Sequence, residues 1–402
     1  MQDNSVLFVV RKESCISLRR YFALADIFYH CYEFNIVFFA VDDCDSDFVK
    51  RCFDDAKQYY GVNELPYDYV HAGQLIKKSL KVDCPLSVEK MDTENELLSL
   101  FLDHQLESSF SLISSHYRAF ESFARNYKPV LVIYDIPILW QTHVLIDACR
   151  TCGAKIVSLE HAEGIGKIYS SFKIFADYYI SYGEMNSLNL NRMGVPDHQI
   201  FQTGNIDTDF MHAVLKRFQK ESVWSKPSLL LILKPSKVPG ANHDNNELVK
   251  VSAENFCNYK ILVRVHPSVK AIKVEMDLLK EIVSQYPNCH FADSSEPLSL
   301  NLVKVNSVIS FPSYALVESI MMKRKTICIS GVQDFAYVDW SSYGISTINK
   351  NVIHKALVPE AFARAELSEA QVNKLIRDFR HRNDDGATRR IVKELIALID
   401  AA

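Results

Sequence analysis

The stretch YKILVRVHPS (259–268) is the clearest buried strand in the sequence, and it sets the expected fold. Its aliphatic run is continuous rather than alternating, which is typical of a parallel strand covered on both faces. The run ends at His266-Pro267, because proline donates no backbone N–H and restricts the residue before it to extended geometry. The sequence therefore predicts a buried parallel strand that presents His266 where it ends.

Other apolar runs of the same form occur in both halves of the chain. In the second half they are 229–237, 288–293, 307–313 and 325–331, and in the first half they are 6–10, 35–41, 129–137 and 154–161. Segments with apolar residues at helical spacing separate these runs. Alternation of strands and helices predicts an α/β fold with two doubly wound, Rossmann-like domains, each built on a parallel sheet.

The strand–helix pattern stops once and then starts again, which divides the chain. We expect a first domain at 1–175, a connection at 176–225, a second domain at 226–365 and a pair of amphipathic helices at 366–402. The connection contains Gly-Val-Pro-Asp and Thr-Gly-Asn, which are turn-forming sequences. A chain of 402 residues also exceeds the size at which one hydrophobic core keeps growing.

Composition excludes several classes of protein. Of the residues, 48% are hydrophobic and 23% are charged, and the formal net charge is −4, so nothing suggests disorder or a nucleic-acid partner. The ten cysteines are scattered, which is typical of reduced thiols in the cytoplasm. The N-terminus lacks the features of a signal peptide, and no apolar run approaches the ~20 residues of a spanning helix. The sequence predicts a cytoplasmic protein.

Polar side chains gather where strands of the second domain are expected to end. A histidine fixed at a strand end can donate an N–H to a phosphate oxygen, and Arg264 lies on the same face as His266. Ser310 and Ser313 flank Phe311-Pro312 before a predicted helix, whose free N–H groups attract an anion. Glu318 lies further along that helix, where it can hold a ribose hydroxyl. Each of these residues has a structural alternative. The histidine can be a strand-end cap, the serines can be helix N-caps, and Glu318 can be a surface carboxylate.

The loop after the run at 229–237 is a second place for anion-binding groups. Lys234 and Ser236 lie where the first loop of a nucleotide-binding domain faces its ligand. A lysine at this place can neutralise the phosphate or carboxylate of a donor, although solvated surface lysines are more common.

These motifs resemble the nucleotide-binding half of the bacterial glycosyltransferases that build capsule and lipopolysaccharide, namely Kdo transferases and sialyltransferases. The resemblance rests on HP after a strand and on the later S-x-x-S…E. In addition, ADYYISYGEMNSLNLNRMGVPDHQIFQTGNIDTD (176–209) is similar to a segment of Kdo transferases and of the CDP-glycerol polymerases of teichoic acid synthesis.

The resemblance implies a GT-B fold, with an acceptor-side first domain facing a CMP-binding second domain across a cleft. It implies transfer of a 2-keto sugar, Kdo or sialic acid, from its CMP donor to an oligosaccharide or lipid-linked glycan of the cell surface. His266, Pro267, Ser310 and Ser313 would bind the CMP phosphate. No cofactor is expected, and the glycan acceptor implies peripheral association with a membrane assembly complex.

Candidate catalytic groups lie at strand ends of the first domain. Asp135 ends LVIYD within the run at 129–137, and EHAEG supplies Glu160, His161 and Glu163. An inverting transferase needs a carboxylate as general base, whereas a retaining one needs a carboxylate nucleophile. EHAEG matches neither the acidic-acidic-Gly motif of sialyltransferases nor the His-Gly of teichoic acid polymerases, so both chemistries stay open.

Other functions remain open at this point. They are a CDP-glycerol or CDP-ribitol phosphotransferase, a non-hydrolysing nucleotide-sugar epimerase and a glycan-assembly scaffold without catalysis. The absence of G-x-G-x-x-G, P-loop and G-x-S-x-G motifs removes the main support for NAD, ATP and serine-hydrolase chemistry. Asp-x-Asp occurs at 43–45 and 207–209, but short acidic runs are common in loops and a CMP leaving group demands no metal. We therefore expect no metal site.

Overall fold

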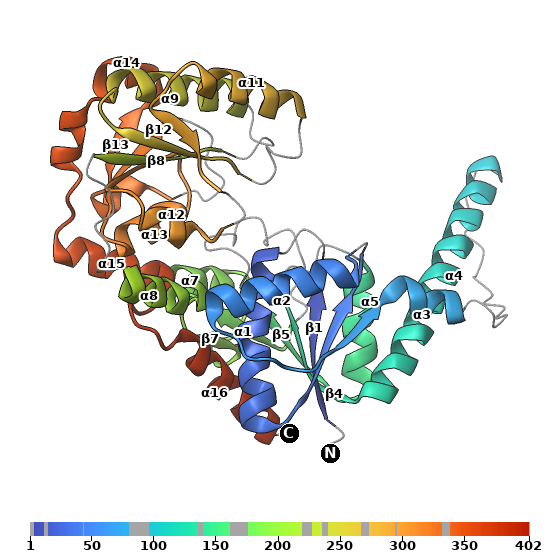
Figure 1. Cartoon of the computed structure of the whole chain (residues 1–402). Helices are drawn as coiled ribbons and strands as arrows, with labels where there is room; N and C mark the ends of the chain where they lie inside the picture. The colour runs from blue at the N-terminus through green and yellow to red at the C-terminus, as the bar shows by residue number, and fades with distance from the viewer. Residues whose placement is uncertain are drawn as a thin grey trace.

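The computed structural model of the chain describes residues 4–11, 15–42, 44–79, 96–135, 140–160, 176–218, 227–234, 240–266, 273–293, 296–331 and 338–401. Within these ranges the strands form two parallel sheets flanked by helices (Figure 1). This confirms the predicted α/β class with two doubly wound, Rossmann-like domains. No helix in these ranges combines the length and apolarity needed to cross a membrane.

The first sheet has seven strands in the order β3-β2-β1-β4-β5-β6-β7, all parallel. The strands are β1 (Ser5–Val10), β2 (Asn35–Ala40), β3 (Asp68–His71), β4 (Pro129–Tyr134), β5 (Lys155–Leu159), β6 (Tyr178–Ser181) and β7 (Ile200–Gln202). The helices are α1 (Cys15–Tyr32), α2 (Ser46–Tyr60), α3 (Ala72–Ser79), α4 (Glu96–Tyr127), α5 (Trp140–Thr151), α7 (Glu184–Arg192) and α8 (Ile206–Phe218). The strand order reverses direction between β1 and β4, which is where open parallel sheets bind ligands.

The second sheet has six strands in the order β10-β9-β8-β11-β12-β13. The strands are β8 (Ser228–Ile232), β9 (Lys260–Arg264), β10 (Cys289–Phe291), β11 (Ser307–Ser310), β12 (Lys325–Ser330) and β13 (Ser346–Asn349). The helices are α9 (Ala241–Asn255), α11 (Lys273–Ser284), α12 (Leu298–Leu302), α13 (Ala315–Met321), α14 (Ile353–Ala356), α15 (Glu369–Arg380) and α16 (Ala387–Asp400). Its order reverses between β8 and β11.

The segment expected to connect the domains also adds two strands to the first sheet. Of residues 176–225, β6 and β7 extend the first sheet, α7 packs beside them, and α8 packs against α1 and α16. The strands are only four and three residues long and are bordered by turn-forming glycines, so they carry too few apolar residues to stand out in the sequence.

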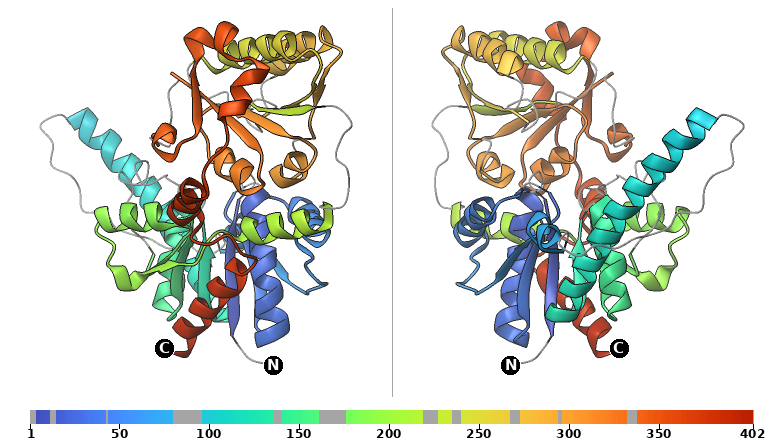
Figure 2. Two further views of the ribbon diagram at one scale, coloured as in Figure 1. Left: turned by 90° about the vertical axis from the view of Figure 1, so that its left-hand side faces the viewer. Right: turned by 90° about the vertical axis from the view of Figure 1, so that its right-hand side faces the viewer.

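The last helix of the chain returns to the first domain. Ile391 and Leu395 of α16 are buried in the same core as Val6 and Phe8 of β1. Both views of Figure 2 show this red helix beside the first domain, with the two termini close together. The chain therefore crosses between the domains a second time, between α15 and α16.

The two domains face each other at the carboxyl edge of the second sheet. Arg19 of α1 pairs with Asp55 at 2.5 Å, and its guanidinium lies 5.6 Å from the ring centre of Tyr59. Burial raises the pKa of Tyr59, and Asp55, Glu296 and Asp293 raise it further. Glu296 and Asp293 follow β10, so charges of the second domain lie within electrostatic reach of the first.

Candidate active site

Three predicted site residues follow three adjacent strands of the second sheet. Lys234 follows β8, His266 follows β9 and Ser310 ends β11, and both β9 and β11 pair directly with β8. The structure thus brings these residues to one edge of the sheet, at the point where its strand order reverses. Such edges are the usual ligand sites of open parallel sheets.

His266 and Arg264 differ in what they offer a ligand. Arg264 donates from Nη2 to the Glu296 carbonyl at 2.9 Å and from Nη1 to the Asp293 carbonyl at 3.3 Å and to the Asn301 side chain. These bonds hold the end of β9 against the loop after β10. His266 is exposed, but the protein around it and then the Arg264 charge lower the pKa of its imidazole. At neutral pH it is therefore an uncharged hydrogen-bond donor.

Ser310 and Ser313 lie in a turn that comes before the helix. Ser310 is buried and donates to the Phe311 carbonyl at 2.8 Å, while its Oγ lies 3.2 Å from that of the half-buried Ser313. Helix α13 begins only at Ala315, and its N-cap Tyr314 makes no side-chain capping bond. The structural alternative, in which the serines are helix N-caps, is therefore wrong, because their hydroxyls bond within the turn.

Lys234 is buried rather than exposed in a loop. Its Nζ lies 2.5 Å from Asp244 Oδ2 and 4.5 Å from the centre of the Phe311 ring. Burial lowers the pKa of Lys234, against the opposing effect of Asp244. The lysine links the ends of β8 and β11 to α9, and a contact with a donor phosphate would require this ion pair to open.

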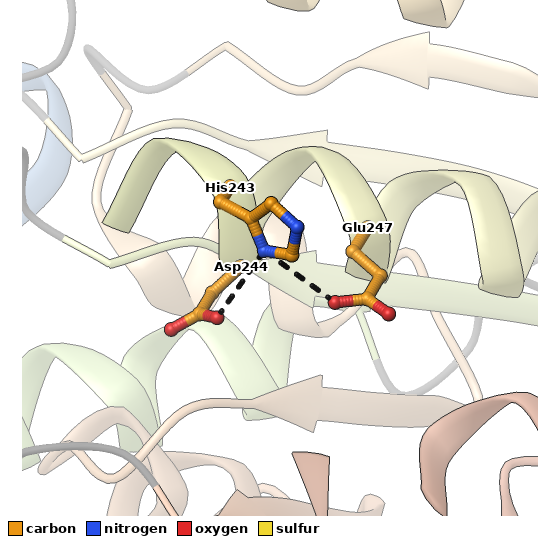
Figure 3. A group of neighbouring side chains, drawn as sticks. All are labelled: His243, Asp244 and Glu247. Carbon is orange, nitrogen blue, oxygen red and sulfur yellow. Dashed lines mark ion pairs between the residues drawn. The ribbon is translucent and has the colours of Figure 1, made fainter. Parts of the chain in front are cut away.

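The Asp244 side chain belongs to a group on α9 whose spacing resembles a metal site. Figure 3 shows His243 between Asp244 and Glu247, with Nδ1 lying 3.8 and 3.7 Å from their oxygens. Both carboxylates already have side-chain partners, however, and those of Asp244 are cationic. Asp244 pairs with Lys234 and, at 3.2 Å, with Lys350, and Glu247 bonds His354 at 2.9 Å. Two ammonium groups on one carboxylate disfavour a cation there.

Glu318 lies on α13, one turn after the serine turn. Its Oε1 accepts from Arg380 Nη2 at 3.2 Å. Burial lowers the pKa of Arg264, and Glu318 is the first of the charges that oppose this effect. Glu318 therefore stands between two arginines at the edge of the site, and its predicted contact with a ribose stays a prediction.

Asp135 and Glu160, two of the candidate catalytic residues, lie directly after strands of the first domain. Asp135 is buried directly after β4, at the reversal point of that sheet. The pKa of Tyr21 is raised first by the burial of Tyr21 itself and next by the charge of Asp135. Glu160 follows β5, and its Oε2 accepts the backbone N–H of Tyr182 at 2.7 Å. Glu160 therefore ties β5 to the end of β6.

Some predicted site residues lie outside the described residues. They are His161, Glu163, Ser236 and Pro267.

The acidic run at 207–209 is used by the protein itself. Asp207 accepts from Arg20 Nη2 at 2.5 Å and from the Tyr60 hydroxyl at 2.6 Å. Asp209 accepts the backbone N–H groups of Ala387 and Thr388, at 2.9 and 2.8 Å, and so binds the first turn of α16. The sequence offered no pairing signal for these contacts, because their partners lie far away in the chain.

Comparison with known proteins places the whole chain in one fold. No family model matches the sequence, and no curated protein matches it in sequence. Among solved structures, it is similar to a UDP-GlcNAc 2-epimerase from Neisseria meningitidis, with 12% identity, a TM-score of 0.62 and coverage of 98% of this chain and 99% of that chain. A UDP-GlcNAc 2-epimerase from Methanocaldococcus jannaschii has 13% identity, a TM-score of 0.59 and coverage of 98% and 99%. A glycosyltransferase from Rickettsia africae has 12% identity, a TM-score of 0.54 and coverage of 100% and 99%. The chain therefore has the two-domain GT-B fold over its full length.

Proposed function

We propose that the protein is a nucleotide-sugar enzyme whose second domain binds the nucleotide. The observation that carries this proposal is the convergence of His266, Ser310 and Ser313 on the reversal point of the second sheet. A neutral imidazole and the Ser313 hydroxyl can donate hydrogen bonds to a phosphate, whereas Ser310 would first have to leave the Phe311 carbonyl. Asp135 lies at the corresponding point of the first sheet, so a sugar held between the domains would meet a carboxylate.

The first candidate reaction is transfer of a 2-keto sugar from its CMP donor to a glycan acceptor, as the HP and serine motifs suggest. His266 and the serine turn would stabilise the departing CMP phosphate. Asp135, Glu160 or Glu163 would act as general base toward the acceptor hydroxyl or as nucleophile. This chemistry needs no metal, and it places the acceptor, an oligosaccharide or lipid-linked glycan, on the side of the first domain.

The second candidate is epimerisation of a UDP-sugar without an acceptor. Similarity of fold favours it, since two of the similar structures contain UDP-GlcNAc. The same carboxylates would then move a proton at the sugar ring instead of activating an acceptor. The two candidates use the same nucleotide site. They differ in the nucleobase of the substrate, in its sugar and in whether an acceptor is needed.

A thermal-shift panel of CMP, CDP, UDP and their sugar or polyol conjugates is expected to give one nucleotide that stabilises the protein. A ligand at a hundred times its Kd stabilises the folded state by about 2.7 kcal/mol. Preference for CMP supports keto-sugar transfer, preference for UDP supports epimerisation and preference for CDP supports polyol phosphate transfer. Product formation with and without an acceptor then separates a transferase from an epimerase. Absence of any shift would contradict a nucleotide-sugar function.

Affinity for a nucleotide sugar is expected to rise as the pH falls below neutrality. In the free protein the pKa of His266 lies below the ordinary value of 6.5, whereas a bound phosphate would raise it. Each unit of that rise increases affinity about tenfold once the pH is below both values. Titration calorimetry at about pH 7.5 and about pH 5.5 measures the slope, because the phosphodiester itself does not titrate there. If the slope persists in His266→Ala, the phosphate does not contact this histidine.

A further inference from the structure

The last turn of α15 rests directly on the backbone of the first sheet. Gly183 follows β6 and Gly204 follows β7, and both face this turn. A Cβ atom on Gly183 would overlap the Asp378 carbonyl, and one on Gly204 would lie 2.9 Å from the Arg380 carbonyl oxygen. Gly204 also has φ of +92°, which favours glycine. Two glycines are therefore needed for the second domain's α15 to seat on the first domain.

Directly after this contact between α15 and the first domain, the chain makes a strained turn. His381 has φ of 64° and ψ of −60°, and the Arg382 N–H donates to the Arg380 carbonyl at 2.7 Å, which makes a γ-turn of the rare, positive-φ form. The Gln202 amide of β7 lies 3.1 Å from His381 Nδ1 and holds the ring. Strained turns persist only where the surrounding structure determines them. The conformation at Arg380 is therefore set by the first sheet.

Arg380 connects this turn with the candidate site. Its side chain is 1% exposed, and its Nη2 donates to Glu318 Oε1 at 3.2 Å. Glu318 lies on α13, which directly follows the turn that contains Ser310 and Ser313. A second ion pair, between the exposed side chains of Arg377 and Glu184 at 2.9 Å, joins α15 to α7. Figure 1 shows the end of α15 at this junction, beside α7 and α8.

We propose that Arg380 is a positioning residue of the nucleotide site. Arg380 holds the Glu318 carboxylate in place, and the position in which it does so depends on how α15 packs against Gly183 and Gly204. A buried guanidinium keeps its carboxylate partner close, because separating the two would leave charges poorly solvated. Any shift of the Arg380 backbone is therefore passed to Glu318. This inference rests on the proposed nucleotide site, and it adds the residue through which the fit between the domains controls that site.

The substitution Gly204→Ala tests the proposal without changing any charge. Its added methyl must displace the Arg380 carbonyl, so we expect affinity for the nucleotide that the wild type prefers, CMP or UDP, to fall about tenfold. Gly194→Ala is the matched control, since Gly194 has the same φ of +92° but no atom within 4 Å of the added Cβ. Both variants place alanine at the same positive φ, and we expect the control to bind within about twofold of the wild type.

A double-mutant cycle tests whether Arg380 acts through Glu318. We expect Glu318→Gln and Arg380→Met to weaken nucleotide binding by similar factors and the double variant to be no weaker than either, whereas Arg380→Lys should restore part of the loss. If Arg380→Met does not fold, Arg380→Lys in both Glu318 backgrounds completes the cycle. Additive losses, or wild-type affinity in Gly204→Ala, overturn the positioning role. If the wild type itself binds none of CMP, CDP and UDP, the proposed function fails instead and the positioning role fails with it.

Discussion

Replacing His266 by alanine is expected to lower kcat by about 10²- to 10³-fold and to leave the fold intact. Loss of one preorganised donor to a developing negative charge typically costs this much. His266 follows β9 as an exposed residue, so its truncation opens no cavity in the core. Steady-state kinetics with the donor identified by the thermal-shift panel measure the effect, and circular dichroism checks the fold.

The matched control for this prediction is His290→Ala. His290 is also an exposed histidine and lies on β10, the strand next to β9. We expect the control to retain turnover within about twofold of the wild type, as surface substitutions usually do. Wild-type turnover in His266→Ala would remove the histidine from the reaction, and equal losses in both variants would point to damage of the sheet rather than of the site.

The central strands of both sheets could be predicted from the sequence, and the edge strands mostly could not. β9 and β8 are continuous aliphatic runs because helices cover both of their faces. In contrast, β3 and β13 each border a sheet, and most of their residues are half-buried or exposed, so neither forms an apolar run. Strand prediction from hydrophobicity therefore detects burial rather than strand geometry.

The candidate site could be predicted as a set of positions but not as a set of contacts. The ends of β9 and β11 supply His266 and Ser310 as expected, since strand order alone brings them to one edge. The sequence did not indicate that Lys234 is neutralised by Asp244, or that Arg264 bonds to the loop after β10. Such pairings depend on side-chain directions within the folded domain, and two charged residues in a sequence do not reveal whether they meet.

The pairing of Asp207 with Arg20 makes the largest predicted contribution to stability among these buried contacts. Asp207 Oδ2 accepts two hydrogen bonds from Arg20, at 2.5 and 3.1 Å, and Oδ1 accepts one from the Tyr60 hydroxyl at 2.6 Å. Arg20 also donates to the Tyr182 hydroxyl at 3.1 Å. These residues join α1, α2, the end of β6 and α8, so the network connects the start of the first domain to the helix that precedes the second.

Asp207→Ala is expected to lower the free energy of unfolding by about 3–5 kcal/mol, because Arg20 stays buried after its carboxylate is removed. Burial alone would raise the pKa of Asp207, but Arg20 and Tyr60 outweigh it and hold the pKa below its ordinary value of 3.8. The carboxylate is therefore charged from pH 7 down to this value, and its contribution is lost only as the pH falls through the lower, folded-state pKa.

Urea unfolding at pH 7 measures the loss, with Asp385→Ala as control, since its pair with Lys216 is exposed and contributes less than about 1 kcal/mol. The double variant Arg20→Met with Asp207→Ala should be more stable than Asp207→Ala alone, because it removes the buried charge as well as its partner; equal stability would mean that the charge of Arg20 is already screened by solvent.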